Sequence, residues 1–142
     1  MNKDTDDLMK KLSSTTSSEE LDSYLEEIRD KYPSDLKSYF KSILEEKGMT
    51  TADMQHKSGI DRTYIYQIMD GRKNPGRDKI IAMSIACRLT LPECQRALEI
   101  AKEGILYSKS RRDSIIIYAI LNNMNIMELN GLLEQYKLPV LN

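Results

Sequence analysis

The chain has 142 residues, 40% of them hydrophobic and 30% charged, with a net charge of −1. This composition is typical of a folded protein and excludes a largely disordered one, and the length allows one core with a small appended part. The longest apolar run, residues 115–121, is too short to span a bilayer, and the acidic start does not resemble a secretory signal. We therefore expect a cytoplasmic protein without a membrane partner.

The start of the chain is predicted to be a tail followed by one helix. Residues 1–17 are polar and rich in serine and threonine, and we expect a flexible tail there. Ser17 and Glu20 have the spacing of a capping box, which predicts an N-terminal amphipathic helix over residues 18–34. Pro33 is expected to stop this helix. Its apolar stripe consists of Leu21, Tyr24, Leu25 and Ile28.

Two further helices are predicted in the next part of the chain. The first begins near Asp35 and ends at Gly48, because glycine favours the left-handed conformation that terminates helices. The second is short, is capped by either Thr50 or Thr51, and runs through Lys57. The residues expected to face inward are Leu36, Tyr39, Phe40, Ile43, Leu44 and Met54.

The segment from Gly59 to Pro75 is the most informative part of the sequence. It reads as a tight turn, a helix over residues 61–70 with Asp61 as its N-cap, and a basic loop closed by proline. Three isoleucines anchor the helix and leave its hydrogen-bonding side chains free to project outward. Reading base edges in the major groove of DNA requires a helix of this kind. The outward residues are Arg62, Thr63, Tyr64, Tyr66 and Gln67.

The same segment lies in the basic part of the chain. Residues 57–88 hold seven basic and three acidic side chains, whereas residues 1–34 hold five basic and nine acidic ones. Contact with phosphate depends on such local charge rather than on the total. A mixed solvated surface would give the same pattern, so charge alone favours neither interpretation.

The second half of the chain contains a repeat with an offset of 35 residues. The run Arg77–Ile81 recurs as Arg112–Ile116, and the correspondence continues to the end of the chain. Each copy reads as an apolar helix capped by the aspartate of the run, a turn, and an amphipathic helix. Residues 107–142 are thus expected to form a helical hairpin that repeats residues 76–106. Since no segment shows the sustained alternation of strands, the predicted fold class is all-α.

Four motifs occur together in the middle of the chain: Gly48-Met49-Thr50-Thr51, Ser58-Gly59-Ile60, the helix Arg62 to Met69, and Gly71-Arg72-Lys73-Asn74-Pro75. With these motifs, residues 35–90 resemble the Cro/C1-type helix-turn-helix domain of phage repressors and of the Xre group of bacterial regulators. The resemblance implies a five-helix DNA-binding domain over residues 35–106, in which the second and third helices form the reading unit. The N-terminal helix and the C-terminal hairpin would be additions to it.

The resemblance also implies a function, a sequence-specific transcriptional regulator that binds double-stranded DNA. In this chain Arg62, Thr63 and Gln67 would touch base edges. One of Tyr64 and Tyr66 is expected to pack inward, and the other to contact a sugar or a thymine methyl. The residues that would lie against phosphates are Thr51, Tyr64, Arg72 and Lys73.

Several residues depart from the family pattern. Gln55 stands where the second helix usually has alanine, so it either widens the angle between the helices or reaches a phosphate itself. Asp61 and Asp70 place negative charge at both ends of the reading helix, which a phosphate surface would repel. These departures support an alternative, a protein–protein interaction module that keeps the helix-turn-helix fold but does not bind DNA.

A homodimer is expected, because one reading helix makes too few contacts for useful specificity. The C-terminal hairpin is the favoured dimerisation element, since the run from Ile115 to Tyr118 offers more apolar surface than one core face needs. The N-terminal helix is the other candidate, and burial of this run against that helix within the same chain is the alternative to dimerisation.

No catalytic, cofactor or metal site is expected. The sole histidine, His56, has no cluster of cysteines or carboxylates in its neighbourhood, so it reads as a surface residue. Cys87 and Cys94 lack metal-type spacing and read as buried reduced thiols. The six glycines are scattered singly, which argues against a phosphate-cradling loop. We therefore expect a protein that is not an enzyme.

Overall fold

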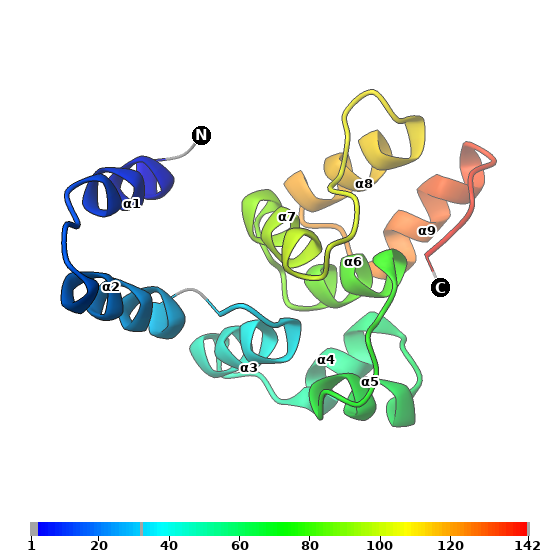
Figure 1. Ribbon diagram of the computed structural model, residues 1–142. Helices are drawn as coiled ribbons and strands as arrows, with labels where there is room; N and C mark the ends of the chain where they lie inside the picture. The colour runs from blue at the N-terminus through cyan, green and yellow to red at the C-terminus, as the bar shows by residue number, and fades with distance from the viewer. Residues whose placement is uncertain (1–2, 32, 142) are drawn as a thin grey trace. The chain divides into compact units, whose positions relative to one another are not determined.

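The computed structural model describes residues 3–31 and 33–141, and the chain divides into two compact units, Met1–Ser34 and Asp35–Asn142. All regular structure within the described residues is helical, which confirms the all-α fold class (Figure 1). None of the described helices is long and apolar enough to cross a membrane.

The first unit contains α1 (Lys3–Ser13) and α2 (Ser18–Lys31) (Figure 1). The expectation of a flexible tail over residues 1–17 is therefore corrected, because most of that stretch is helical. Leu8 and Leu12 lie one turn apart on the same face of α1, and Lys10 in its last turn complements the helix dipole. Ser17 accepts a hydrogen bond from the Glu20 amide at 3.1 Å, as the predicted cap requires.

The two helices of this unit are joined by an ion pair between Lys11 and Glu27. Both side chains are about half exposed, so the pair contributes little to stability. Larger apolar side chains also remain exposed on both helices, among them Met9, Leu12, Leu21 and Leu25.

The second unit contains seven helices in its described part. Its first helix begins and ends close to the predicted residues. Asp35 caps one helix by accepting from the Ser38 amide at 2.8 Å, and Gly48 ends it in the left-handed conformation. The helices are α3 (Leu36–Lys47), α4 (Thr51–Ser58), α5 (Arg62–Met69), α6 (Arg77–Ala86), α7 (Leu91–Ile100), α8 (Arg111–Leu121) and α9 (Ile126–Gln135).

The core of this unit is organised around α6. Every residue from Ile80 to Ala86 is buried, and α6 contacts α4, α7 and α9. A helix that is buried all round must lie at the centre of a helical fold. The predicted inward residues of α3 and α4, including Phe40 and Met54, contribute to the same core.

The hairpins α6–α7 and α8–α9 share structural details at the 35-residue offset of the sequence repeat. Arg88 and Asn123, which follow the first helix of each hairpin, both have φ 54°. Gln95 makes two hydrogen bonds to the backbone of Leu106, and the equivalent Asn130 makes two to the backbone of Leu141. Equivalent side chains in the two hairpins thus hold the segment that follows each hairpin against its second helix.

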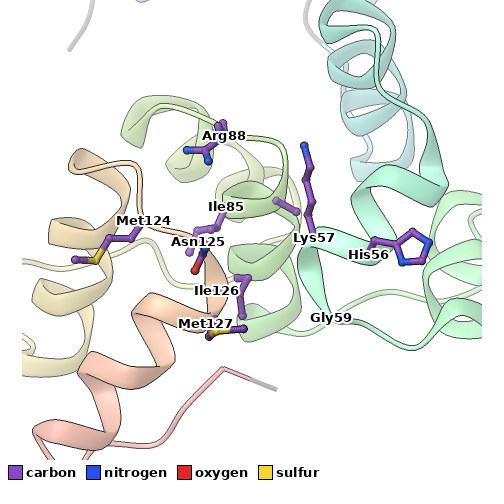
Figure 2. Close-up of a pocket in the computed structure, with 10 residues that line it drawn as sticks. His56, Lys57, Gly59, Ile85, Arg88, Met124, Asn125, Ile126 and Met127 are labelled. Carbon is purple, nitrogen blue, oxygen red and sulfur yellow. The ribbon is translucent and has the colours of Figure 1, made fainter.

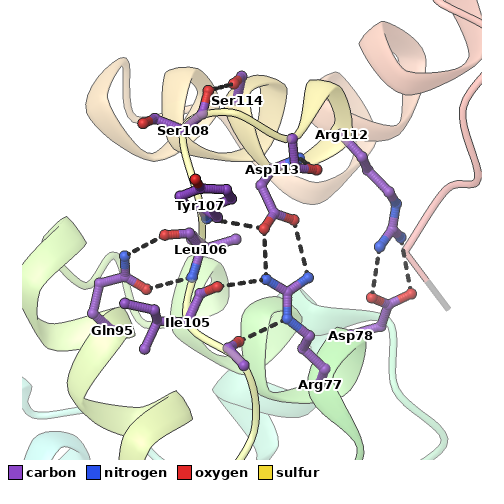
Figure 3. A network of polar contacts seen from close by, with 12 residues as sticks. Arg77, Asp78, Gln95, Ile105, Leu106, Tyr107, Ser108, Arg112, Asp113 and Ser114 are labelled. Carbon is purple, nitrogen blue, oxygen red and sulfur yellow. Dashed lines mark hydrogen bonds and ion pairs between the residues drawn. The ribbon is translucent and has the colours of Figure 1, made fainter.

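The arginines of the repeat bind the aspartates of the opposite copy (Figure 3). Arg77 donates to both carboxylate oxygens of Asp113 at 3.0 and 2.7 Å, and Arg112 donates to both oxygens of Asp78 at 2.9 Å. The prediction that these aspartates cap their helices is therefore wrong. Each points instead at the guanidinium of the other hairpin, and the N-cap of α8 is Ser110. We call these four residues the reciprocal clamp.

The clamp also fixes the loop that follows each hairpin. The Nε atom of Arg77 donates to the Gly104 carbonyl at 2.8 Å, and that of Arg112 donates to the Pro139 carbonyl at 2.9 Å. Asp113 in addition accepts from the Tyr107 amide at 2.9 Å (Figure 3). Asp113 is buried and the other three side chains are partly buried, and such charges are stable only when they are paired and hydrogen-bonded, as these are.

The apolar run of α8 packs mainly inside the second unit. Ile116 is fully buried, and Ile115 and Ile117 are half-buried against the same core. Tyr118 is 53% exposed, and Leu121 at the end of the helix is exposed as well. Most of the apolar surface of this run, which the sequence suggested for a dimer contact, is thus buried in the core of the second unit.

Candidate nucleic-acid interface

The turn between α4 and α5 is short and closely held. Gly59 ends α4 with φ 73°, a conformation that other residues rarely adopt, and its amide donates to the Gln55 carbonyl at 3.1 Å. Ile60 is buried, and Asp61 caps α5 by accepting from the Tyr64 amide at 3.1 Å. The predicted turn and N-cap are therefore both present.

The side chain of Gln55 stabilises this turn. Its amide nitrogen donates to the Ile60 carbonyl at 2.8 Å, while the Ser58 hydroxyl accepts from the Ile60 amide at 3.2 Å. Both backbone groups of a buried residue are thus paired. The Gln55 amide is thus used within the turn, which argues against the alternative that this side chain reaches a phosphate.

The preceding helix is capped by Thr50 rather than Thr51. Thr50 and Asp53 form a reciprocal capping box, and the hydrogen bonds from the Thr50 backbone and hydroxyl lower the pKa of Asp53. The hydroxyl of Thr51, half-buried at the first position of α4, makes no hydrogen bond within the described chain.

Two faces of α5 differ sharply in their surroundings. Ile65, Ile68 and Met69 are buried against the core of the unit. Arg62 and Thr63, on the other side of the helix, are exposed. The helix therefore presents a polar surface without depending on it for packing.

The two tyrosines of α5 have different roles. Tyr64 is half-buried and packs against the core, with the ammonium of Lys79 lying 5.3 Å from its ring centre. Tyr66 is 38% exposed, and the guanidinium carbon of Arg62 lies 5.8 Å from its ring centre. Of the pair, Tyr64 is the one that packs inward.

The polar side chains at the outer face are not engaged elsewhere in the described part of the molecule. Arg62 forms no hydrogen bond or ion pair there, and its guanidinium lies over the ring of Tyr66. Neither the hydroxyl of Thr63 nor the half-buried amide of Gln67 has a hydrogen-bond partner among the described residues. The hydrogen-bonding groups of these three side chains are therefore not used within the described part of the chain.

The basic loop after α5 is partly neutralised. Arg72 donates to the Asp70 carboxylate at 2.7 Å, and both side chains are more than half exposed. Lys73 is exposed and makes no ion pair with any described residue. A cation that the sequence analysis missed, Lys37 of α3, lies alongside Gly71. No local signal marks it, because it is far from this loop in sequence.

Two of the basic residues in this region serve the fold instead. Arg77 is committed to the reciprocal clamp, where hydrogen bonds to Asp113 raise its pKa. Lys79 lies against Tyr64. The positive charge available to a ligand is therefore smaller than the sequence count suggests.

No metal-binding or reactive group accompanies this surface. The described residues contain no cluster of histidine, cysteine and carboxylate side chains that could hold a metal ion. Cys87 and Cys94 are buried and reduced, and burial raises the pKa of the Cys87 thiol to about 11. Their thiols are therefore structural side chains.

Comparison with known proteins gives one match. Residues 40–94 match the family model described as Helix-turn-helix, a stretch that runs from within α3 into α7 and includes both α4 and α5. No curated protein and no solved structure matches the chain.

Proposed function

Residues 40–94 form a helix-turn-helix domain of the Cro/C1 type, a family of DNA-binding regulators, and from this premise we propose that the chain regulates transcription by reading specific double-stranded DNA sequences through α5. The observation that carries this proposal is the unengaged outer face of α5. Arg62, Thr63 and Gln67 project hydrogen-bonding groups from a helix whose other face is fixed in the core.

Each side chain suits a particular contact in the major groove. Arg62 can donate two hydrogen bonds to guanine, and Gln67 can both donate to and accept from adenine. Thr63 can bond either kind of base edge, and the exposed ring of Tyr66 can contact a thymine methyl or a sugar. To reach guanine, Arg62 must leave the ring of Tyr66, and the loss of this contact costs on the order of 1 kcal/mol at an exposed site.

Phosphate contacts would surround this face. Thr51 lies at the start of α4, where amides and a free hydroxyl are well placed for an anion. The Tyr64 hydroxyl, Lys73 and Arg72 would lie on the other side, with Arg72 exchanging Asp70 for a phosphate. Such contacts position the helix but carry no sequence information.

We expect the active form to be a homodimer, because one short helix reads too few bases. Residues 107–142 would supply the contact through the exposed Tyr118 and Leu121 of α8. Light scattering of the free protein measures the mass directly, and a monomer at all concentrations would contradict this part of the proposal.

The test begins with selection of bound sequences from a random DNA pool, followed by titration of the selected site and of unrelated DNA. Arg62→Ala is expected to weaken the selected site by about 1–3 kcal/mol while changing unrelated DNA little. Lys73→Ala should weaken both and reduce the salt dependence by about one phosphate contact.

Arg111→Ala is the matched control, since Arg111 is also an exposed arginine at the first position of a helix but lies outside the helix-turn-helix domain. It should leave both titrations unchanged. Equal losses from Arg62→Ala and Arg111→Ala would show that the effect is one of net charge and would overturn the assigned role of Arg62.

A protein-interaction module is the second candidate, favoured by one observation. Arg62 stacked on an exposed Tyr66 is the composition of an interface hot spot, and Asp70 neutralises the neighbouring Arg72. This alternative predicts no retention on heparin or bulk DNA at low salt, whereas the DNA-binding proposal predicts retention that salt reverses.

A further inference from the structure

A half-open hollow of about 490 Å³ lies within the second unit, and no residue of α5 lines it. It is formed where α4 and α6 end and α9 begins (Figure 2). Its apolar wall comprises Ile85, Met124, Ile126 and Met127. Apolar hollows of this volume are the usual form of small-molecule sites.

The rim of the hollow carries positive charge. Lys57 and Arg88 line it together with the apolar residues, and no acidic residue is among the lining groups (Figure 2). Lys57 is exposed and makes no hydrogen bond or ion pair within the described chain. Arg88 uses only Nη1, which donates to the Asn123 carbonyl at 3.0 Å, so the rest of its guanidinium is available.

We propose that this hollow binds a small organic anion that joins an apolar chain or ring to a single carboxylate or phosphate head. The apolar wall calls for the hydrocarbon part of this ligand, and the two cations call for its anionic head. The apolar wall is covered only by a hydrocarbon portion, and Lys57 and Arg88 lose solvation without compensation unless an anionic head replaces the water.

The walls decide against simpler ligands. Met127 is 82% exposed and Ile126 is half-buried, so both have apolar surface that a hydrocarbon would cover and an inorganic ion would leave in water. An uncharged hydrocarbon would leave the head position unfilled. The ligand also touches α4, the first helix of the reading pair, and α9 of the C-terminal hairpin, so it would tie these two elements together.

The proposal does not depend on DNA binding and is tested without DNA. The full chain, labelled with carbon-13 at its methionine methyl groups, is titrated with octanoate, octyl phosphate, octanol and acetate below micelle-forming concentrations. Octanoate or octyl phosphate should shift the Met124 and Met127 signals saturably, and the stronger of the two identifies the head group. Octanol and acetate should require much higher concentrations.

Two methionines serve as internal controls. Met83 is fully buried in α6 and reports whether the core stays folded, whereas Met9 is exposed on α1 and reports non-specific coating by an amphiphile. Neither signal should shift over the range that saturates Met124. Equal shifts at Met9, or equal half-saturation by octanol and octanoate, would overturn the proposal.

Substitutions then show which residues contact the anionic head of the ligand and which contact its hydrocarbon part. Lys57→Gln should raise the half-saturation concentration roughly two- to fivefold, the effect of an ion pair at a partly exposed site. Lys41→Gln is the matched control, because Lys41 is exposed on α3 and does not line the hollow. Equal behaviour of the two variants would overturn the role of Lys57.

The hydrocarbon contact is tested with Met127→Gln, which should also weaken binding when followed at Met124. A shift of Met124 and Met127 on raising the protein concentration alone would instead mean that a second copy of the chain fills the hollow. That result would overturn the proposal as well.

Discussion

Arg62 and Arg77 each occupy the first position of a helix, yet they serve the molecule in opposite ways. The guanidinium of Arg77 donates hydrogen bonds to Asp113 and to two loop carbonyls, all of which lie far along the chain. Arg62 makes no hydrogen bond or ion pair with any described residue, and its guanidinium lies over the ring of Tyr66. The difference shows that the partners of a charged residue, rather than its type or its place in a helix, separate a structural role from a binding one.

The same contrast divides the polar surface of the second unit into two regions. In the reciprocal clamp every charged group has a partner, whereas on the outer face of α5 the polar groups are unengaged. Substitutions in the clamp should therefore act on stability, and those on α5 should act on binding.

The largest expected effect is that of Asp113→Ala. The Asp113 side chain is 8% exposed, and its removal leaves Arg77 partly buried without its counter-charge. We expect a loss of about 3 kcal/mol in the free energy of unfolding. Urea unfolding measures it, with Asp78→Ala as the comparison. That variant should cost less, because Asp78 is more exposed, and an equal cost would contradict the assignment to burial.

A smaller effect is expected from acid, because protonation leaves the carboxyl group of Asp113 in place. Burial alone would raise its pKa, but hydrogen bonds from Arg77 and from the Tyr107 amide outweigh burial and lower the pKa below the ordinary 3.8. The stability that ionised Asp113 contributes is therefore fully present above pH 3.8. It is lost as the pH falls towards and through the lower pKa that Asp113 has in the folded protein. Unfolding midpoints measured down to pH 3 should fall more steeply for the natural chain than for Asp113→Asn.

Gln55→Ala and Gln67→Ala extend the comparison to two glutamines. Removing Gln55 leaves the carbonyl of buried Ile60 without a donor, and we expect a loss of about 1–2 kcal/mol in unfolding free energy. Gln67→Ala should change stability by less than about 0.5 kcal/mol. In DNA binding the order should reverse, with the salt dependence unchanged by Gln55→Ala. A reduced salt dependence in that variant would show that Gln55 contacts a phosphate after all.

The smallest effect on stability is expected for Asp70→Asn. Its ion pair with Arg72 is exposed, so unfolding should change by less than about 0.5 kcal/mol. DNA affinity should instead rise roughly two- to fivefold, because a negative charge is removed and Arg72 is released. Filter binding at low salt measures it. Weaker binding would mean that the pair positions Arg72 for its contact.

Features set by neighbouring residues could be predicted from the sequence. The start of α3 near Asp35, the cap at Asp61, the end of α3 at Gly48 and the inward isoleucines of α5 depend on short spacings, and the structure contains them. The tail prediction failed because the apolar positions of α1 are too few to stand out from a polar composition.

Features set by distant partners could not be predicted. Nothing local indicates that Asp78 and Asp113 exchange arginines instead of capping their helices, or that Gln55 closes the turn. Likewise Lys37 reaches the loop at Gly71 only because α3 folds beside it. The unengaged state of Arg62 is likewise a property of the folded surroundings.

The crossed arginines have a practical consequence for dissecting the molecule. A fragment that ends at residue 94 or 106 retains the segment that matches the family model. It lacks Asp113, the partner of Arg77, and Arg112, the partner of Asp78, and it also exposes the side of α6 that α9 contacts. Such a piece would have exposed hydrophobic surface and orphaned charge where the intact chain has neither. We therefore expect the smallest part of the chain that folds on its own to extend through α9, beyond the end of the segment that matches the family model.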